Sequence, residues 1–109
     1  MPPVRQIDVT TEALGPRAWR LAVVGELDLV TAGDVVDDLR RALRHGDHIV
    51  LDLTGVDFAD STGLAALLRC RRMAGSSGAT LEILVDPGGP VDQAARITRI
   101  SGVLGLSED

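Results

Sequence analysis

Apolar and polar residues alternate with a period of two in four short segments of the chain. Successive side chains of a β-strand point to opposite faces, so this alternation is typical of strands with one apolar face. The pattern is weak in the first segment and clear in the last, where Leu81, Ile83 and Val85 share one face. The four predicted strands are residues 4–9, 18–25, 48–54 and 80–85.

Between these segments the apolar spacing changes to that of a helix and predicts three helices. The best-specified helix follows Thr31 and ends at Gly46, with acids in its first turns and arginines in its last, as the helix dipole favours. Thr31 and Asp34 resemble a capping box, in which two side chains bind backbone N–H groups reciprocally. Two further helices are predicted at residues 61–74 and 91–100. The apolar face of the first helix comprises Val35, Val36, Leu39, Ala42 and Leu43.

Glycine, proline and small polar residues mark the predicted connections. They indicate turns at residues 12–17, 75–78 and 86–90 and a loop at residues 55–60, because glycine and proline interrupt regular structure. Residues 101–106 are apolar but broken by glycine, and we expect a short last strand there.

The order of these elements predicts the fold class. Strands that alternate with helices favour a parallel sheet. Strands buried on both faces are continuously apolar, however, whereas these strands keep an alternating pattern. We therefore predict an α/β protein whose helices pack mainly on one face of the sheet.

Composition narrows the possible environments. A chain of 109 residues fits a single domain. Its net charge of −5 argues against non-specific nucleic-acid binding, which depends on neutralising phosphates. No segment approaches the about 18 consecutive apolar residues of a membrane span, and the N-terminus lacks the apolar core of a signal peptide. With Cys70 as the single cysteine, no internal disulfide can form, so we expect a cytoplasmic protein that does not contact membranes.

Three catalytic or binding chemistries are disfavoured by the residues themselves. Ser61, Asp60 and His48 could form a hydrolytic triad, but no Gly-x-Ser-x-Gly elbow is present and His48 opens a strand on the far side. His45 and His48 lack the further ligands of a metal site. The pair of glycines at residues 88–89 lacks the Lys-Ser/Thr of a phosphate-binding loop. We therefore expect neither an enzyme nor a bound cofactor or metal.

The segment before the second helix carries the most information. Asp60 and Ser61 stand where a helix begins, and either of them can be the N-cap that binds a free backbone N–H group. Gly63 lies in the first turn, where glycine costs about 1 kcal/mol against alanine but lets another backbone approach closely. A simple helix cap explains Asp60 and Ser61 taken alone.

Taken with two upstream segments, this segment resembles the STAS family, and within it the bacterial anti-sigma factor antagonists. The resemblance spans most of the chain and implies a single STAS domain over residues 1–109. It also implies a mixed sheet of four to five strands with helices mainly on one face. The carboxy-terminal helix that is usual in the family is expected to be short or missing in this chain. The segments concerned are Gly25-Glu26-Leu27-Asp28, Ile49-Val50-Leu51-Asp52-Leu53 and Phe58-Ala59-Asp60-Ser61-Thr62-Gly63-Leu64.

The resemblance further implies a protein that switches partners. The unphosphorylated form would bind an anti-sigma factor serine kinase and release the sigma factor. The kinase, which supplies ATP and magnesium, would phosphorylate Ser61 and break the complex, and a phosphoserine phosphatase would restore it. The protein itself would be a monomer or weak dimer. The implied partner-binding residues are Asp28, Asp60, Thr62, Gly63 and Leu64.

A second role is compatible with the same fold. Some STAS domains are non-switching structural subunits, for example of lipid-transport or stress-signalling complexes. Such a subunit would bind its partner constitutively, regardless of the charge at Ser61. The Asp-Ser-Thr-Gly-Leu segment and its acidic surroundings favour the switch.

Overall fold

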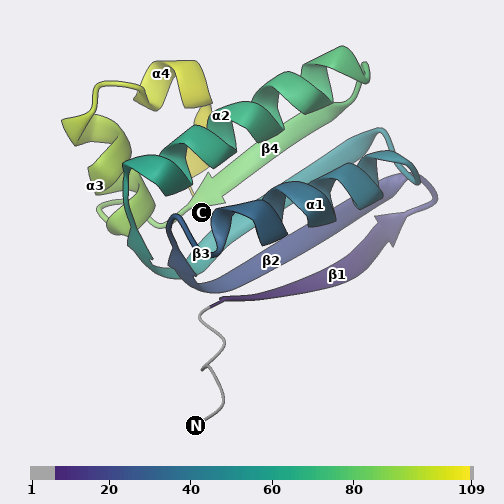
Figure 1. Cartoon of the computed structure of the whole chain (residues 1–109). Coiled ribbons are helices and arrows are strands. Elements are labelled where there is room, and N and C mark those ends of the chain that lie inside the picture. The colour runs from purple at the N-terminus through teal and green to yellow at the C-terminus, as the bar shows by residue number, and fades with distance from the viewer. Residues whose placement is uncertain (1–6, 109) are drawn as a thin grey trace, which may run out of the picture.

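The computed structural model describes residues 7–108, which form one five-stranded sheet (Figure 1). The strands follow each other across the sheet in sequence order. The first two are antiparallel and all other neighbours are parallel, so the predicted mixed sheet is confirmed. The strands are β1 (Ile7–Gly15), β2 (Ala18–Leu27), β3 (His48–Ala59), β4 (Thr80–Val85) and β5 (Leu106–Glu108).

Four helices connect the strands. Parallel neighbours need a crossover connection, which α1 supplies between β2 and β3 and α2 supplies between β3 and β4. Figure 1 shows α1 and α2 lying next to each other over one face of the sheet, with α3 near the first turn of α2. No helix among residues 7–108 is long and apolar enough to cross a membrane. The helices are α1 (Ala32–Leu43), α2 (Ser61–Ser76), α3 (Pro90–Ile97) and α4 (Ser101–Leu104).

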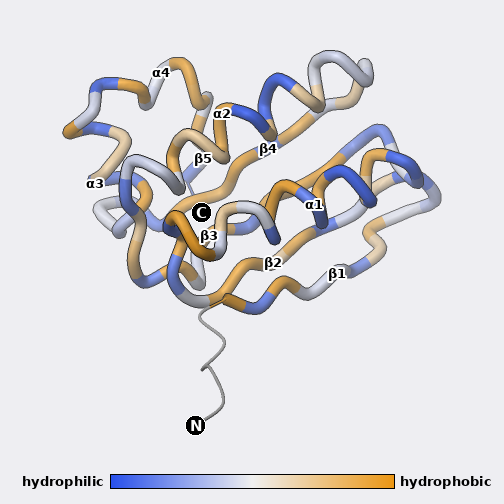
Figure 2. Tube along the Cα trace, in the orientation of Figure 1, coloured by the Kyte–Doolittle hydropathy of each residue, from blue (hydrophilic) through white to orange (hydrophobic). Residues whose placement is uncertain are grey.

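The core lies between the sheet and the two long helices. Leu21, Leu51 and Ile83 form one row across β2, β3 and β4, and all three are 0% exposed. Leu39 of α1 and Leu67 of α2 are also 0% exposed. Figure 2 shows the apolar residues concentrated on the strands and alternating with hydrophilic ones along α1 and α2. The alternation in the sequence therefore identified the buried face correctly.

An ion pair occupies the other face of the sheet. Arg20 on β2 donates through Nε to Oδ2 of Asp52 on β3 at 3.0 Å, and Thr54 donates through its backbone N to Oδ1 at 2.9 Å. Burial raises the pKa of the Asp52 carboxyl, but the hydrogen bonds from Arg20 and Thr54 outweigh it and hold the pKa below its usual value. Asp52 is therefore a charged, fully satisfied structural residue.

The first hairpin is longer than predicted. β1 continues to Gly15, so the turn expected at residues 12–17 is wrong in extent, and the chain reverses only at residues 16–17. Residues 4–6 of the predicted first strand lie outside the described residues. Antiparallel pairing with β2 holds residues 10–15 in the strand although their own pattern is weak.

The third strand is also longer than predicted. The loop expected at residues 55–60 is wrong, because β3 continues to Ala59 alongside an extended β2. The pairing shifts register between Ala22 and Val24 and again between Gly25 and Glu26. Such irregularities break the alternation of apolar and polar residues, which is why the sequence pattern hid this part of the strand.

The C-terminal part differs most from prediction. α3 ends at Ile97 instead of residue 100, and most of the strand expected at residues 101–106 is the short helix α4. Gly105 ends α4 with a left-handed φ of 62°, and Arg71 of α2 donates through Nε to the Leu104 carbonyl at 3.1 Å. A side chain from a distant helix thus helps to hold this segment in place.

Candidate functional site

The ends of β2 and β3 bring two distant segments together. Leu27 pairs with Ala59 at the end of the two strands, and the Asp60 backbone N donates to the Leu27 carbonyl at 3.2 Å. Each strand is followed by the first turn of a helix at the same edge of the sheet (Figure 1). The structure therefore places the loop that carries Asp28 beside the residues around Ser61.

Asp60 is the N-cap of α2. Its backbone is extended and its carboxylate accepts a hydrogen bond from the Gly63 backbone N at 2.9 Å. The Leu64 backbone N donates to the Asp60 carbonyl at 3.0 Å, which closes the first turn. Of the two possible caps, Asp60 performs this role, and Ser61 is the first residue of the helix.

Ser61 is exposed, and Thr62 beside it is half-buried. Within residues 7–108, no side chain or backbone group forms a hydrogen bond with the Ser61 hydroxyl. The hydroxyl is therefore not needed to hold the helix start. The residue is open to solvent, and it lies where backbone N–H groups favour an added anion.

Gly63 fixes the contact between the two segments. A Cβ at this position would lie 2.3 Å from the Leu27 carbonyl oxygen and 2.8 Å from Leu27 Cγ. Gly63 and Leu64 are both buried, so these two predicted partner-binding residues shape the site from within. Of the other predicted site residues, Ser61 is exposed and Asp28, Asp60 and Thr62 are half-buried.

The start of α1 is held by a different network. The Asp28 carboxylate accepts from the backbone N of Val30 at 3.0 Å and of Thr31 at 3.2 Å. Thr31 Oγ1 accepts from the Asp28 backbone N at 3.0 Å and donates to the Glu26 carbonyl at 2.6 Å. The predicted capping box of Thr31 with Asp34 is wrong, because the reciprocal partner of Thr31 is Asp28, three residues before it.

Exposed apolar side chains lie in the same two segments. Leu29 is 75% exposed and Val30 78% in the loop after β2, and Phe58 is 47% exposed near the end of β3. Exposed apolar groups beside polar ones are typical of protein contact surfaces. The sequence analysis missed these residues, although the available signal was two adjacent apolar residues between the strand predicted to end at residue 25 and the helix predicted after Thr31.

The charge around Ser61 is negative. The segments 26–34 and 55–65 contain no arginine or lysine. A new anion on Ser61 would therefore lie near like charges. The acidic residues of the two segments are Glu26, Asp28, Asp34, Asp57 and Asp60.

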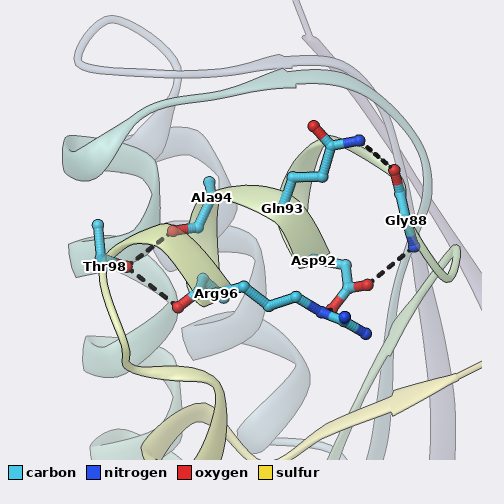
Figure 3. Close-up of polar contacts among 7 residues, drawn as sticks. Gly88, Asp92, Gln93, Ala94, Arg96 and Thr98 are labelled. Carbon is cyan, nitrogen blue, oxygen red and sulfur yellow. Dashed lines mark hydrogen bonds and ion pairs between the residues drawn. The ribbon is translucent and has the colours of Figure 1, made fainter.

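The turn before α3 lies at the same edge of the sheet and is fixed by its own carboxylate (Figure 3). Asp92 Oδ2 accepts from the Gly88 backbone N at 2.8 Å, and Oδ1 accepts from Arg96 Nε at 3.0 Å. The Gly88 hydrogen bond, followed by the one from Arg96, holds the pKa of Asp92 below its usual value. Because a carboxylate already occupies the Gly88 N–H, this glycine turn is a structural one.

The residues considered for a hydrolytic triad and for a metal site do not form such sites within residues 7–108. His48 opens β3 and its Nδ1 lies 3.0 Å from Thr80 Oγ1, whereas Ser61 follows the opposite end of that strand. Asp47, between the two histidines, pairs with Arg17 at 3.1 Å. Across residues 7–108, no three His, Cys, Asp or Glu side chains gather as metal ligands would. Burial raises the pKa of the Cys70 thiol to about 12, so this cysteine is an unreactive core residue.

This mixed five-stranded sheet with helices over one face matches the fold of STAS domains. The family described as "Mlab, STAS domain" matches residues 10–107, and the chain belongs to this family. Among curated proteins, no sequence matches the chain.

Solved anti-sigma factor antagonists have similar structures. One from Mycobacterium paratuberculosis has a TM-score of 0.76 and 19% identity, covering 94% of this chain and 84% of that one. The antagonist SpoIIAA in its unphosphorylated form has a TM-score of 0.70 and 16% identity, covering 94% and 88%. The Bacillus cell fate determinant SpoIIAA in its phosphorylated form has a TM-score of 0.69 and 18% identity, covering 94% and 91%. At these identities the likeness shows the fold.

Proposed function

We propose that this protein is an anti-sigma factor antagonist regulated by phosphorylation of Ser61. The unphosphorylated form binds an anti-sigma factor serine kinase in the cytoplasm and thereby releases a sigma factor. The observation that carries this proposal is the exposed Ser61 hydroxyl, free of structural hydrogen bonds, within a surface that is acidic and partly apolar. The chain has a binding role and no catalytic one.

The chemistry of the switch belongs to the partners. The kinase transfers the γ-phosphoryl group of ATP to Ser61 Oγ, the hydroxyl proton leaves to a base, and ADP is released with the magnesium ion of the kinase. A phosphoserine phosphatase hydrolyses the ester and returns the hydroxyl. This chain supplies an accessible acceptor and needs no cofactor of its own.

The charge added by phosphorylation is large enough to break a complex. Phosphoserine carries about −1.5 to −2 charges at pH 7. Two like charges about 4 Å apart repel by about 1 kcal/mol in bulk water and about 4 kcal/mol at an effective dielectric constant of 20. The repulsion therefore increases by about 3 kcal/mol when a partner excludes water from Asp28 and Asp60. Because each 1.4 kcal/mol changes affinity about tenfold, this increase weakens binding about 150-fold.

The fold itself tolerates the added charge. Ser61 is the first residue of α2, where the helix dipole stabilises an anion by about 0.3–1 kcal/mol. Repulsion from nearby carboxylates opposes this gain while the site is open to water. Phosphorylation therefore acts on the contact with a partner and leaves the domain folded.

A second candidate is a STAS subunit that does not switch. The family description names Mlab and no anti-sigma factor antagonist, so family membership is compatible with both roles. Thr62, half-buried beside Ser61, and the exposed Leu29 and Val30 would serve a constitutive contact equally well. The two candidates differ in whether binding depends on the charge of residue 61.

The test is a capture experiment from native cell extract with wild-type, Ser61→Asp and Ser61→Asn protein as bait, read by mass spectrometry. Asparagine matches aspartate in shape but has no charge. We expect wild type and Ser61→Asn to capture a small ATP-binding kinase that Ser61→Asp loses. Urea denaturation should place both variants within about 0.5 kcal/mol of wild type, as for surface substitutions.

Two outcomes would contradict the switch. If all three proteins capture the same partner equally, the charge of residue 61 does not matter and the non-switching subunit is the better description. If Ser61→Asn loses the partner as completely as Ser61→Asp, the serine is a contact residue instead of a charge switch.

A further inference from the structure

A basic groove lies far from Ser61, between the C-terminal halves of α1 and α2. Its volume is about 720 Å³. Arginines line it from both helices, while Leu43 and Met73 add half-buried apolar surface. Figure 2 shows hydrophilic stretches in the same parts of the two helices. The four arginines are Arg40 of α1, Arg44 at the C-cap of α1, and Arg69 and Arg72 of α2.

Most of this positive charge is unpaired. Arg40 forms an ion pair with Asp37 at 3.0 Å. Arg44, Arg69 and Arg72 are exposed, and none of them pairs with a carboxylate among residues 7–108. A helix C-terminus stabilises a cation in its last turn by about 0.3–1 kcal/mol. This accounts for Arg40 in the last turn of α1, but the last turn of α2 contains no basic residue, so it does not account for Arg69 and Arg72. Four guanidinium groups facing one groove also repel one another, and this repulsion is relieved by an anion.

Arg71 shows what a structural arginine on the same helix looks like. Its guanidinium donates to the carbonyl oxygens of Leu81 and Leu104 and to that of Gly105 at 3.2 Å. The bonds to Leu104 and Gly105 hold the C-terminal segment against α2, and the bond to Leu81 connects α2 to β4. Arg69 and Arg72, two and one residues away in the sequence, have no such bonds within the described residues and keep their donors free.

We propose that this groove binds an acidic polypeptide segment of a partner protein, with its carboxylates on the four arginines and an apolar side chain between Leu43 and Met73. Guanidinium groups bind carboxylates with paired hydrogen bonds, and methionine adapts its shape to an inserted side chain. A long nucleic acid is disfavoured because the net charge of the chain is −5. A short acidic segment contacts only the basic groove and avoids the rest of this charge.

The groove is electrostatically separate from Ser61. Along α2, Arg69 and Arg72 lie about 12 and 17 Å beyond Ser61, at 1.5 Å per residue. Both distances exceed the Debye length of about 8 Å at physiological ionic strength. The groove would therefore hold its acidic segment whether or not Ser61 carries a phosphate, and the inference does not depend on the proposed switch.

The test uses a fluorescein-labelled peptide rich in glutamate with two leucines, followed by fluorescence anisotropy against the full chain. The groove variant is Arg69→Gln with Arg72→Gln, and the matched control is Arg17→Gln with Arg41→Gln, which removes two exposed charges outside the groove. We expect the groove variant to bind about tenfold more weakly, as for the loss of two exposed ion pairs. The control and Ser61→Asp should bind like wild type, and binding should weaken between ~50 and ~300 mM salt.

Several results would overturn the proposal. Absence of binding by wild type up to about 1 mM peptide would show that the groove does not recognise acidic segments. Equal binding of a peptide with glutamine in place of glutamate would remove the charge argument, as would equal loss in the control variant. Tighter binding of a single-stranded oligonucleotide or of anionic lipid vesicles would assign the groove to another class of partner.

Discussion

The first turns of α1 and α2 lie at the same edge of the sheet and carry similar residues, an aspartate and a hydroxyl. At the start of α1, Thr31 is 3% exposed, and its hydroxyl accepts from the backbone N of Asp28 and donates to the carbonyl of Glu26. In α2, Asp60 alone caps the helix, and the Ser61 hydroxyl is exposed. The same chemistry is structural in one helix and available to a partner in the other.

The difference comes from whether backbone groups near each hydroxyl need it as a hydrogen-bond partner. In the loop after β2, the Asp28 and Thr31 side chains are the hydrogen-bond partners of part-buried backbone groups of Glu26, Asp28 and Thr31. The chain enters α2 directly from the end of β3, and the Asp60 carboxylate satisfies the Gly63 N–H. Ser61 is left without a structural task, which is the condition for a modification site that does not unfold its domain.

The largest effect is expected from Gly63→Ala, which tests whether the two helix starts depend on close contact. The new methyl group would lie 2.3 Å from the Leu27 carbonyl oxygen, and such overpacking costs about 3 kcal/mol. The matched control is Gly75→Ala in the same helix, which has nothing within 4 Å and should stabilise by up to about 1 kcal/mol. Urea denaturation measures both, and equal stabilisation by the two alanines would contradict the close contact.

A smaller effect is expected from removing each hydroxyl in turn. Thr31→Val keeps the shape but removes the side-chain partner of part-buried backbone groups of Glu26 and Asp28, which costs about 2 kcal/mol. Ser61→Ala removes a hydroxyl without such bonds and should change the free energy of unfolding by less than about 0.5 kcal/mol. Similar losses in the two variants, measured by urea denaturation, would mean that the two hydroxyls do not differ in role.

A loss smaller than that of Thr31→Val is expected at Asp60, where the capping hydrogen bond and the charge can be separated. Asp60→Ala removes the acceptor for the Gly63 N–H and should cost about 1 kcal/mol, whereas Asp60→Asn keeps a capping oxygen and should cost only a few tenths. Thermal unfolding of both variants checks this. If asparagine were as harmful as alanine, the charge of Asp60 would stabilise α2 more than its hydrogen bond does.

Much of the fold could be predicted from the sequence because its causes are local. The apolar face of α1 and the strand at residues 80–85 were predicted correctly, since burial on one side imposes a period on neighbouring residues. The capping box of Thr31 was wrong because Asp34 has the right type and spacing, while Asp28 lies nearer in the folded loop. Local spacing alone does not distinguish these two partners.

The sequence by itself determined the alternation of strands and helices, the buried face of each and the position of Ser61 at a helix start, because these depend on periodicity and on residue types in one turn. Only the tertiary structure decided that β3 runs on to Ala59 beside β2. It also decided that the loop carrying Asp28 lies beside the start of α2 and that arginines from α1 and α2 share one groove. Contacts between distant segments depend on register and helix packing, and these are set by the whole core.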